Sequence, residues 1–130
     1  MIVIDSSALV AILHGEPERE QFIDAIVDYG NPRISSATYL EVAMVMELRW
    51  GDQGGRELDA LIDEVSIEIA PFDYIQAKAA RDGFRRYGKG LHRAALNFGD
   101  CFTYALAKTL DVPLLFKGAD FALTDVKRAL

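Results

Sequence analysis

The sequence predicts an α/β protein, a three-layer α/β/α sandwich with a central parallel sheet. Short apolar runs rich in β-branched residues alternate with longer segments of helical periodicity, as crossovers between parallel strands require. The hydrophobic fraction of 51% is enough for a core buried on both sides of such a sheet. No linker, repeat or low-complexity tract interrupts the 130 residues, so residues 1–130 are expected to form a single domain.

The first half of the chain is expected to hold two strands and three helices. Residues 2–4 form an apolar run typical of a buried parallel strand, and Asp5 directly after it favours a helix N-terminus. Gly15 and Pro17 interrupt the helical pattern that follows. The expected elements are a strand over residues 2–4, a helix ending near residue 13, a helix over 18–29, a strand over 33–35 and a helix from Thr38 to about residue 49.

The second half continues the alternation. Leu58, Leu61, Ile62 and Val65 follow the spacing of an amphipathic helix, and Asn97 is a good N-cap for a later one. The expected elements are a helix over residues 55–65, a strand over 66–70, a helix opened by residue 73, a flexible loop over 88–94, a helix from 97 to about 110 and a strand over 112–116.

Charge and composition exclude several classes. The formal net charge is -6, whereas a protein that only wraps nucleic acid should be basic, so the acids are either unrelated to nucleic acid or needed to hold cations. Cys101 is the only cysteine, which excludes a disulfide-stapled secreted scaffold. No apolar run approaches the roughly 20 residues of a membrane span, and the start lacks a basic signal-peptide region. A cytoplasmic protein without membrane contact is expected.

Four acids are expected at one edge of the sheet. Asp5 follows the first strand, Glu41 lies early in the helix after the second, Asp100 opens the helix before the last strand, and Asp120 follows that strand. Ligands of open α/β sheets bind outside the carboxyl ends of the strands, where the returning helices also begin. Carboxylates from four distant segments are therefore expected to converge there.

Close carboxylates repel one another unless cations or protons intervene. A hard divalent ion such as Mg²⁺ accepts a few carboxylate ligands, keeps several waters and leaves room for a phosphate. It can lower the pKa of a bound water and neutralise charge on the phosphorane. The pattern therefore favours metal-dependent hydrolysis of a phosphodiester by acidic residues alone.

Each acid also has a structural interpretation. Thr38 and Glu41 match a capping box, and Asn97 and Asp100 resemble the same arrangement. Asp5 could be a helix cap, and Asp120 could belong to a turn. The metal site depends on all four meeting at one edge.

Four segments resemble VapC toxins, the PIN-domain ribonucleases of type II toxin–antitoxin systems, and together they span essentially the whole chain. They are Val3-Ile4-Asp5-Ser6-Ser7-Ala8-Leu9, Ser36-x-x-Tyr39-x-Glu41, Asn97-Phe98-Gly99-Asp100-Cys101-Phe102 and Leu114-Leu115-Phe116-Lys117-Gly118-x-Asp120-Phe121. The resemblance implies a PIN-like fold and cleavage of RNA that depends on Mg²⁺ or Mn²⁺. It also implies a homodimer, a VapB-type antitoxin and a hetero-oligomer of toxin and antitoxin.

By motif match, Asp5, Glu41 and Asp100 carry over as metal-site acids. Ser7 carries over as the hydroxyl that supports Asp5, and Asn97 is expected to support the site beside Asp100. Many members of the family have a fourth acid at the position that Gly118 occupies here. Asp120 either substitutes for that acid or the fourth acid is absent, which leaves open whether one or two ions bind.

A basic surface could hold the RNA backbone by charge-assisted contacts. The alternative is a solvated helix face beside a loose loop. The residues expected to bind RNA are Lys89, His92, Arg93, Arg85 and Arg86.

Other classes fit less well. A receiver-type signalling module needs an acidic pair after the first strand and a phospho-acceptor Asp after a middle strand, but Asp5 stands alone. A phosphatase with an aspartyl nucleophile needs a second Asp where Ser7 stands. The remaining alternative is a catalytically inactive PIN-like module that binds RNA or a partner, against which the intact acids argue.

Overall fold

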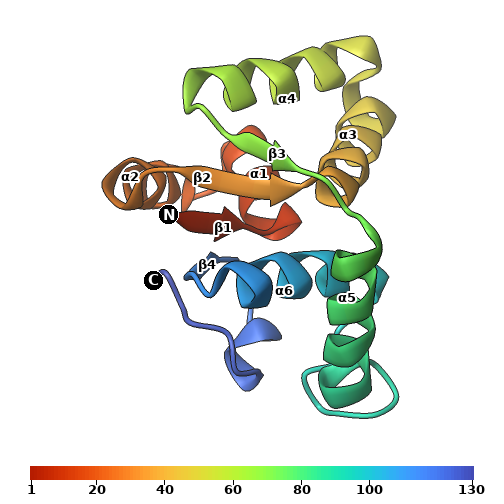
Figure 1. Cartoon of the computed structure of the whole chain (residues 1–130). Helices are drawn as coiled ribbons and strands as arrows, with labels where there is room; N and C mark the ends of the chain where they lie inside the picture. Colours follow the sequence, from red (N-terminus) through yellow and green to blue (C-terminus); the bar gives the residue numbers. More distant parts are fainter.

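The computed structural model describes residues 1–130 and contains six α-helices around a four-stranded sheet (Figure 1). The strands are β1 (Ile2–Ile4), β2 (Pro32–Ser35), β3 (Glu68–Ala70) and β4 (Leu114–Leu115). The helices are α1 (Ser6–Leu13), α2 (Arg19–Tyr29), α3 (Ser36–Trp50), α4 (Asp52–Glu64), α5 (Tyr74–Tyr87) and α6 (Phe98–Leu110), with a 3₁₀ turn η1 at Phe121–Leu123. No helix is both long and apolar enough to cross a bilayer.

All strand pairs are parallel, and the order across the sheet is β3-β2-β1-β4. Ile2 and Ile4 point to one face, into a core shared with α1, α2, α3 and α4. Val3 points to the other face, into a second core built on α5 and α6. Figure 1 shows the sheet between these two groups of helices. The predicted three-layer sandwich with a central parallel sheet is therefore confirmed.

One error in the expected elements concerns α3, which was expected to start at Thr38. The helix begins at Ser36, because the Ser35 side chain accepts a hydrogen bond from the Ala37 amide and caps it. Thr38 is fully buried inside the first turns. The capping box of Thr38 with Glu41 is therefore wrong, and Glu41 is not needed to satisfy backbone donors.

The last strand is shorter than expected. Only Leu114 and Leu115 pair with β1, although residues 112–116 are all apolar. The outer edge of β4 is covered by the C-terminal segment, because the Leu114 amide donates to the Lys127 carbonyl and the Ala129 amide donates to the Leu114 carbonyl. Phe121, in the segment that follows β4, is buried in the second core.

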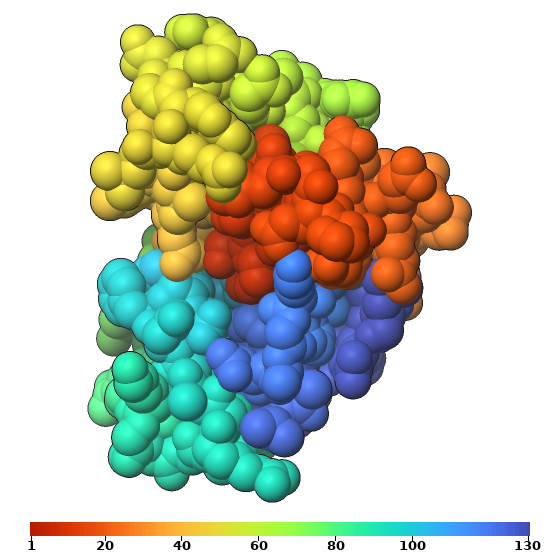
Figure 2. All heavy atoms as spheres, turned by 180° about the vertical axis from the view of Figure 1, so that it is seen from behind, coloured from red at the N-terminus to blue at the C-terminus, as the bar shows by residue number.

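Because the four strands are parallel, their carboxyl ends lie at one edge of the sheet, on the right in Figure 1. The helices α1, α3 and α6 begin at this edge. Figure 2 shows the rear face, where the red N-terminal segment, the yellow α3, the cyan start of α6 and the blue C-terminal segment adjoin. The fold thus brings together the segments that carry the four acids.

Candidate metal site

Asp5 is almost completely buried, with 2% of its surface exposed. One oxygen, Oδ2, accepts hydrogen bonds from the Ser7 amide at 3.0 Å and from the Ser7 hydroxyl at 2.6 Å. The other oxygen, Oδ1, is buried without a hydrogen-bond partner. The expected helix cap is real, but it uses only one oxygen, and a buried carboxylate oxygen left without a partner is costly unless a cation completes it.

Glu41 lies in the second turn of α3 and is half-buried against the start of α6. Burial raises the pKa of its carboxyl, the nearby Ser6 hydroxyl opposes this rise, and the charge of Asp5 adds to it. Its Oε1 is buried without a hydrogen-bond partner. Gly99 leaves it room: a methyl group at Gly99 would stand 2.7 Å from the Glu41 Cδ and would overlap the carboxylate.

Asp100 forms the predicted capping box of α6. Its Oδ2 accepts from the Asn97 amide at 3.0 Å, and its own amide donates to Asn97 Oδ1 at 2.9 Å. Burial nevertheless raises the pKa of Asp100 from 3.8 to about 6, and the charges of Asp5, Asp120 and Glu41 add to the rise. Asp100 therefore caps α6 and is also destabilised as a charged group by its burial and by the neighbouring acids.

We expect Asp100→Asn to stabilise the protein in a chelator at pH 7. A raised pKa means that the folded state binds the proton more tightly than the unfolded chain, so stability falls as pH rises from about 4 through about 6. After allowance for solvent screening, relief is on the order of 1 kcal/mol, or a rise of roughly 3–5 °C in melting temperature. The difference should vanish well below pH 3.8, where Asp100 is protonated in both states. A lower melting temperature at pH 7 would mean that the cap outweighs the repulsion.

Asp120 stands at the start of η1 and is exposed. It does stand in a turn, where its carbonyl accepts from the Leu123 amide, but its side chain makes no cap hydrogen bond. Its charge contributes to the raised pKa of Asp100, which puts Asp120 within electrostatic reach of the other acids. Gly118 has a φ of +106° and open space around its Cβ position, and it lets the chain turn between β4 and Asp120.

The structure thus brings the acids of four segments to one edge and leaves buried oxygens on Asp5 and Glu41 without partners. In the conformation described, no three acidic, histidine or cysteine side chains form a ready-made metal cage. One carboxylate oxygen of Asp5 is bonded to Ser7 and one of Asp100 to Asn97, and these bonds help to keep the acids from forming such a cage. Hard carboxylate oxygens, buried and mutually repulsive, fit a divalent cation such as Mg²⁺ or Mn²⁺.

The basic loop before α6 is tied down rather than loose. The Lys89 amide donates to the Leu96 carbonyl, and the Leu96 amide donates to the Tyr87 carbonyl. His92 accepts from the Ala94 amide at 3.0 Å and packs edge-on against Tyr87. Lys89 and Arg93 are exposed. The loop that was expected to be flexible therefore has a backbone that is paired across its base.

The two arginines of the predicted basic surface that lie on α5 differ from each other. Arg85 forms an exposed ion pair with Asp82 at 3.3 Å. Arg86 lies 3.3 Å from Asp125 and donates to the Tyr104 hydroxyl, and so joins α5, α6 and the C-terminal segment. The guanidinium of Arg86 therefore already has a structural role, while the RNA-binding role of the group stays a prediction.

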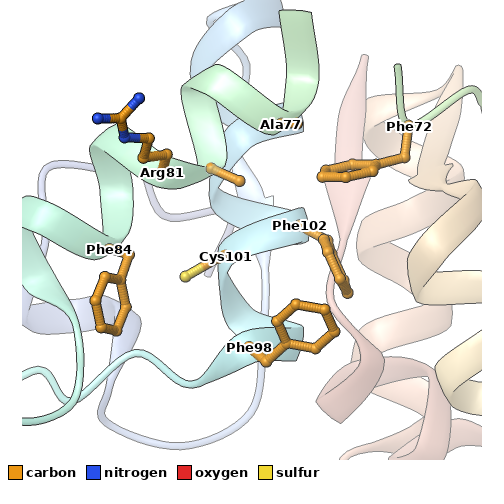
Figure 3. Close-up of a pocket in the computed structure, with 8 residues that line it drawn as sticks. Phe72, Ala77, Arg81, Phe84, Phe98, Cys101 and Phe102 are labelled. Atoms are coloured by element: carbon orange, nitrogen blue, oxygen red, sulfur yellow. The ribbon is translucent and has the colours of Figure 1, made fainter. Parts of the chain in front are cut away.

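Two apolar hollows flank the start of α6. One, of about 630 Å³, lies between α5 and α6, and Figure 3 shows Phe84, Phe98 and Cys101 around it. The other lies between α3 and α6, and Phe98 and Phe102 line both. Phe98 is 81% exposed. Large apolar side chains are usually buried, and where they are exposed beside other apolar residues they often mark an interaction surface.

Sequence reasoning missed two residues that shape the site. Ser6 acts on Glu41, and the only signal was a second hydroxyl beside Asp5. Gly99 gives the Glu41 carboxylate its space, and the only signal was a glycine in the first turn of a helix, where it lowers helix propensity. Both contacts join segments that are far apart in sequence.

Comparison with known proteins agrees with this architecture. A family model described as PIN domain matches residues 2–127. "Ribonuclease VapC" of Mycolicibacterium smegmatis is 55% identical over 125 residues, which cover 96% of this chain and 97% of that protein.

Two solved structures share the fold. VapC20 of Mycobacterium tuberculosis, described as a sarcin-ricin loop cleaving toxin, superposes with a TM-score of 0.78 at 12% identity, over 97% of this chain and 96% of that one. A toxin-antitoxin complex from Klebsiella pneumoniae gives a TM-score of 0.72 at 18% identity, over 96% and 93% of the two chains. With a family match over nearly the whole chain and a relative above 50% identity, the chain belongs to the VapC family of PIN-domain ribonucleases, the toxins of type II toxin–antitoxin systems.

Proposed function

We propose that this ribonuclease is a metal-dependent endoribonuclease in which Asp5, Glu41 and Asp100 hold Mg²⁺ or Mn²⁺. Asp120 completes the acidic set. Residues 1–130 act as a single domain, in the cytoplasm. One observation carries the proposal. The buried oxygens of Asp5 and Glu41 have no partner, while burial, together with the charges of the neighbouring acids, raises the pKa of Asp100 to about 6. Such an arrangement is unfavourable in the bare protein and becomes favourable with a divalent cation.

When bound, such an ion supplies a water of lowered pKa and positive charge for the phosphate oxygens of RNA. The chain's own residues prepare the site. Ser7 fixes one oxygen of Asp5 and leaves the other directed to the site, and Asn97 holds Asp100 at the start of α6. Asp120 is the most exposed of the acids, on the side from which a substrate phosphate can approach.

Lys89 and Arg93 are the best candidates for contact with the RNA backbone, because both are exposed and the structure gives their side chains no ion pair. His92, Arg85 and Arg86 are proposed as secondary contacts, since each already has a partner within the protein. The loop leads directly into α6, so cations on it would lie on the same side of the fold as Asp100.

We further propose a homodimer and a hetero-oligomer with a VapB-type antitoxin. Leu40, Met44 and Leu48 form an apolar stripe on α3, with exposed fractions of 59%, 58% and 89%. A second copy of the chain on this stripe would bury it around a two-fold axis. The α5–α6 hollow beside Phe98 suits an apolar antitoxin segment. The toxin–antitoxin complex that shares the fold supports a partner of this kind.

Leu48→Lys should convert the dimer to a monomer, because two-fold symmetry brings two buried charges into the interface. The Leu48 side chain is almost fully exposed in a single copy, so the free energy of unfolding of the monomer should change by less than about 0.5 kcal/mol. Light scattering of the purified toxin measures the mass. Val27→Lys on α2, exposed to 66%, is the matched control and should stay dimeric. A Leu48→Lys dimer would exclude the α3 stripe as the interface.

The metal proposal is tested by cleavage of a labelled mixed RNA pool with Mg²⁺, Mn²⁺ or EDTA, together with calorimetric titration of Mn²⁺ into chelator-treated protein. Cleavage should require the ion and cease in EDTA. Calorimetry should detect binding even if the pool lacks the preferred RNA. Cleavage that persists in EDTA, or protein that binds neither ion, would overturn the proposal.

A further inference from the structure

Lys117 lies two residues after β4, and both its side chain and its backbone amide have partners in other segments. Its ammonium group pairs with Glu16 Oε1 and lies 2.7 Å from Glu18 Oε2. Both acids belong to the connection between α1 and α2 (Leu13–Arg19), about a hundred residues earlier in the chain. Its backbone amide donates to the Ser7 hydroxyl at 3.0 Å.

The same Ser7 hydroxyl donates to Asp5 Oδ2 at 2.6 Å. Residue 117 is thus joined by one bridging oxygen to the most buried acid of the site. The Asp5 amide also donates to the Leu115 carbonyl at 2.9 Å, so the exits of β1 and β4 are fixed together. From Lys117 the chain reaches Asp120 through Gly118, whose positive φ makes the turn. Whatever fixes Lys117 therefore limits where Asp120 can stand.

Lys117 is not free to bind a phosphate. Hydrogen bonding to Glu16 and then to Glu18 raises the pKa of Lys117, and Lys117 lowers the pKa of Glu16, so the ammonium group is held by partners within the protein. A lone exposed ion pair adds little to stability. Here the Lys117 ammonium pairs with two acids of a different segment. These pairs therefore matter more for the position of the turn after β4 than for the stability of the protein.

We propose that Lys117, through its ion pairs with Glu16 and Glu18, is a positioning residue that holds the turn after β4 so that Asp120 faces Asp100 across the metal site. The inference rests on the proposed assignment of Asp120 to that site. Supporting residues of this kind typically change metal affinity by about tenfold or more when removed. Lys117→Met should therefore weaken Mn²⁺ binding by roughly tenfold, and Lys117→Arg, which keeps the charge, should restore most of it.

The test combines two measurements on the full chain. Hydrogen exchange of the metal-free protein follows the Lys117 amide, which should exchange faster in Lys117→Met because its bond to Ser7 opens more often. Calorimetric titration of Mn²⁺ then compares the parent, Lys117→Met, Asp120→Asn and the double variant. Since Lys117 acts through Asp120, Lys117→Met should cause no further loss in the Asp120→Asn background.

Lys127→Met is the matched control, because Lys127 forms an ion pair with Asp111 at 3.0 Å and touches none of the four acids. It should leave Mn²⁺ binding and the Lys117 amide unchanged. Unchanged binding in Lys117→Met, or equal losses in both backgrounds, would overturn the positioning role. If Asp120→Asn alone binds Mn²⁺ like the parent, the role falls with the assignment of Asp120. A parent protein that binds no Mn²⁺ would instead overturn the metal site itself.

Discussion

Asp5→Asn should abolish RNA cleavage by this ribonuclease while leaving the fold intact. The substitution keeps the shape of the side chain and one oxygen for the Ser7 amide, so the start of α1 remains capped. It removes the charge from the most buried acid of the site, whose second oxygen has no partner within the protein. The loss of one carboxylate at a metal centre should lower the rate by at least roughly 1000-fold, about 4 kcal/mol in the barrier.

The measurement is single-turnover cleavage with saturating Mn²⁺, with circular dichroism as the check on folding. Asp59→Asn is the matched control, because it removes the same charge from an exposed acid on α4 whose side chain accepts a hydrogen bond from Tyr39 and has no part in the proposed site. The control should cleave like the parent. If Asp5→Asn also cleaves like the parent, Asp5 serves only as the cap of α1 and the proposed metal site is wrong.

The part of the fold that follows from strand direction was predictable from sequence. The short apolar runs 2–4 and 112–116 have no alternating pattern, which indicates strands buried on both faces and therefore a parallel sheet. In such a sheet the residue after each strand lies at the same edge, so Asp5 and Asp120 could be placed together before any coordinates. Glu41 and Asp100 followed because helices return from that edge.

The remaining features depend on tertiary contacts that no local pattern contains. A capping box of Thr38 with Glu41 is sound local reasoning, but Ser35 captures the N-terminus of α3 and leaves Thr38 in the core. The apolar run after residue 111 predicts a long strand, yet only two of its residues find a partner in β1. Likewise, the pairing of Lys117 with Glu16 joins segments that only the folded sheet brings together.

Gly99→Ala is expected to impair the site from a position that carries no chemistry. The new methyl group would stand 2.7 Å from Cδ and 2.8 Å from Oε1 of Glu41, closer than side chains tolerate. The capping box of Asn97 and Asp100 fixes the backbone at Gly99, so the Glu41 carboxylate must move instead. A displacement on the order of 1 Å at a catalytic group costs roughly 100-fold in rate. We expect that loss together with weaker Mn²⁺ binding in calorimetry.

The melting temperature distinguishes a local effect of Gly99→Ala on the site from a general loss of folding. Alanine is favoured over glycine within a helix by about 1 kcal/mol, which offsets part of the steric cost in α6. The melting temperature should therefore fall far less than the activity. Gly55→Ala is a close control, because its methyl group would also meet a carboxylate, Glu47 Oε2 at 2.8 Å, but on an exposed side chain that is free to move. It should leave cleavage unchanged. If Gly99→Ala cleaves like the parent and Glu41→Gln does not, Glu41 adapts to the methyl group. If both variants cleave like the parent, Glu41 lies outside the catalytic set.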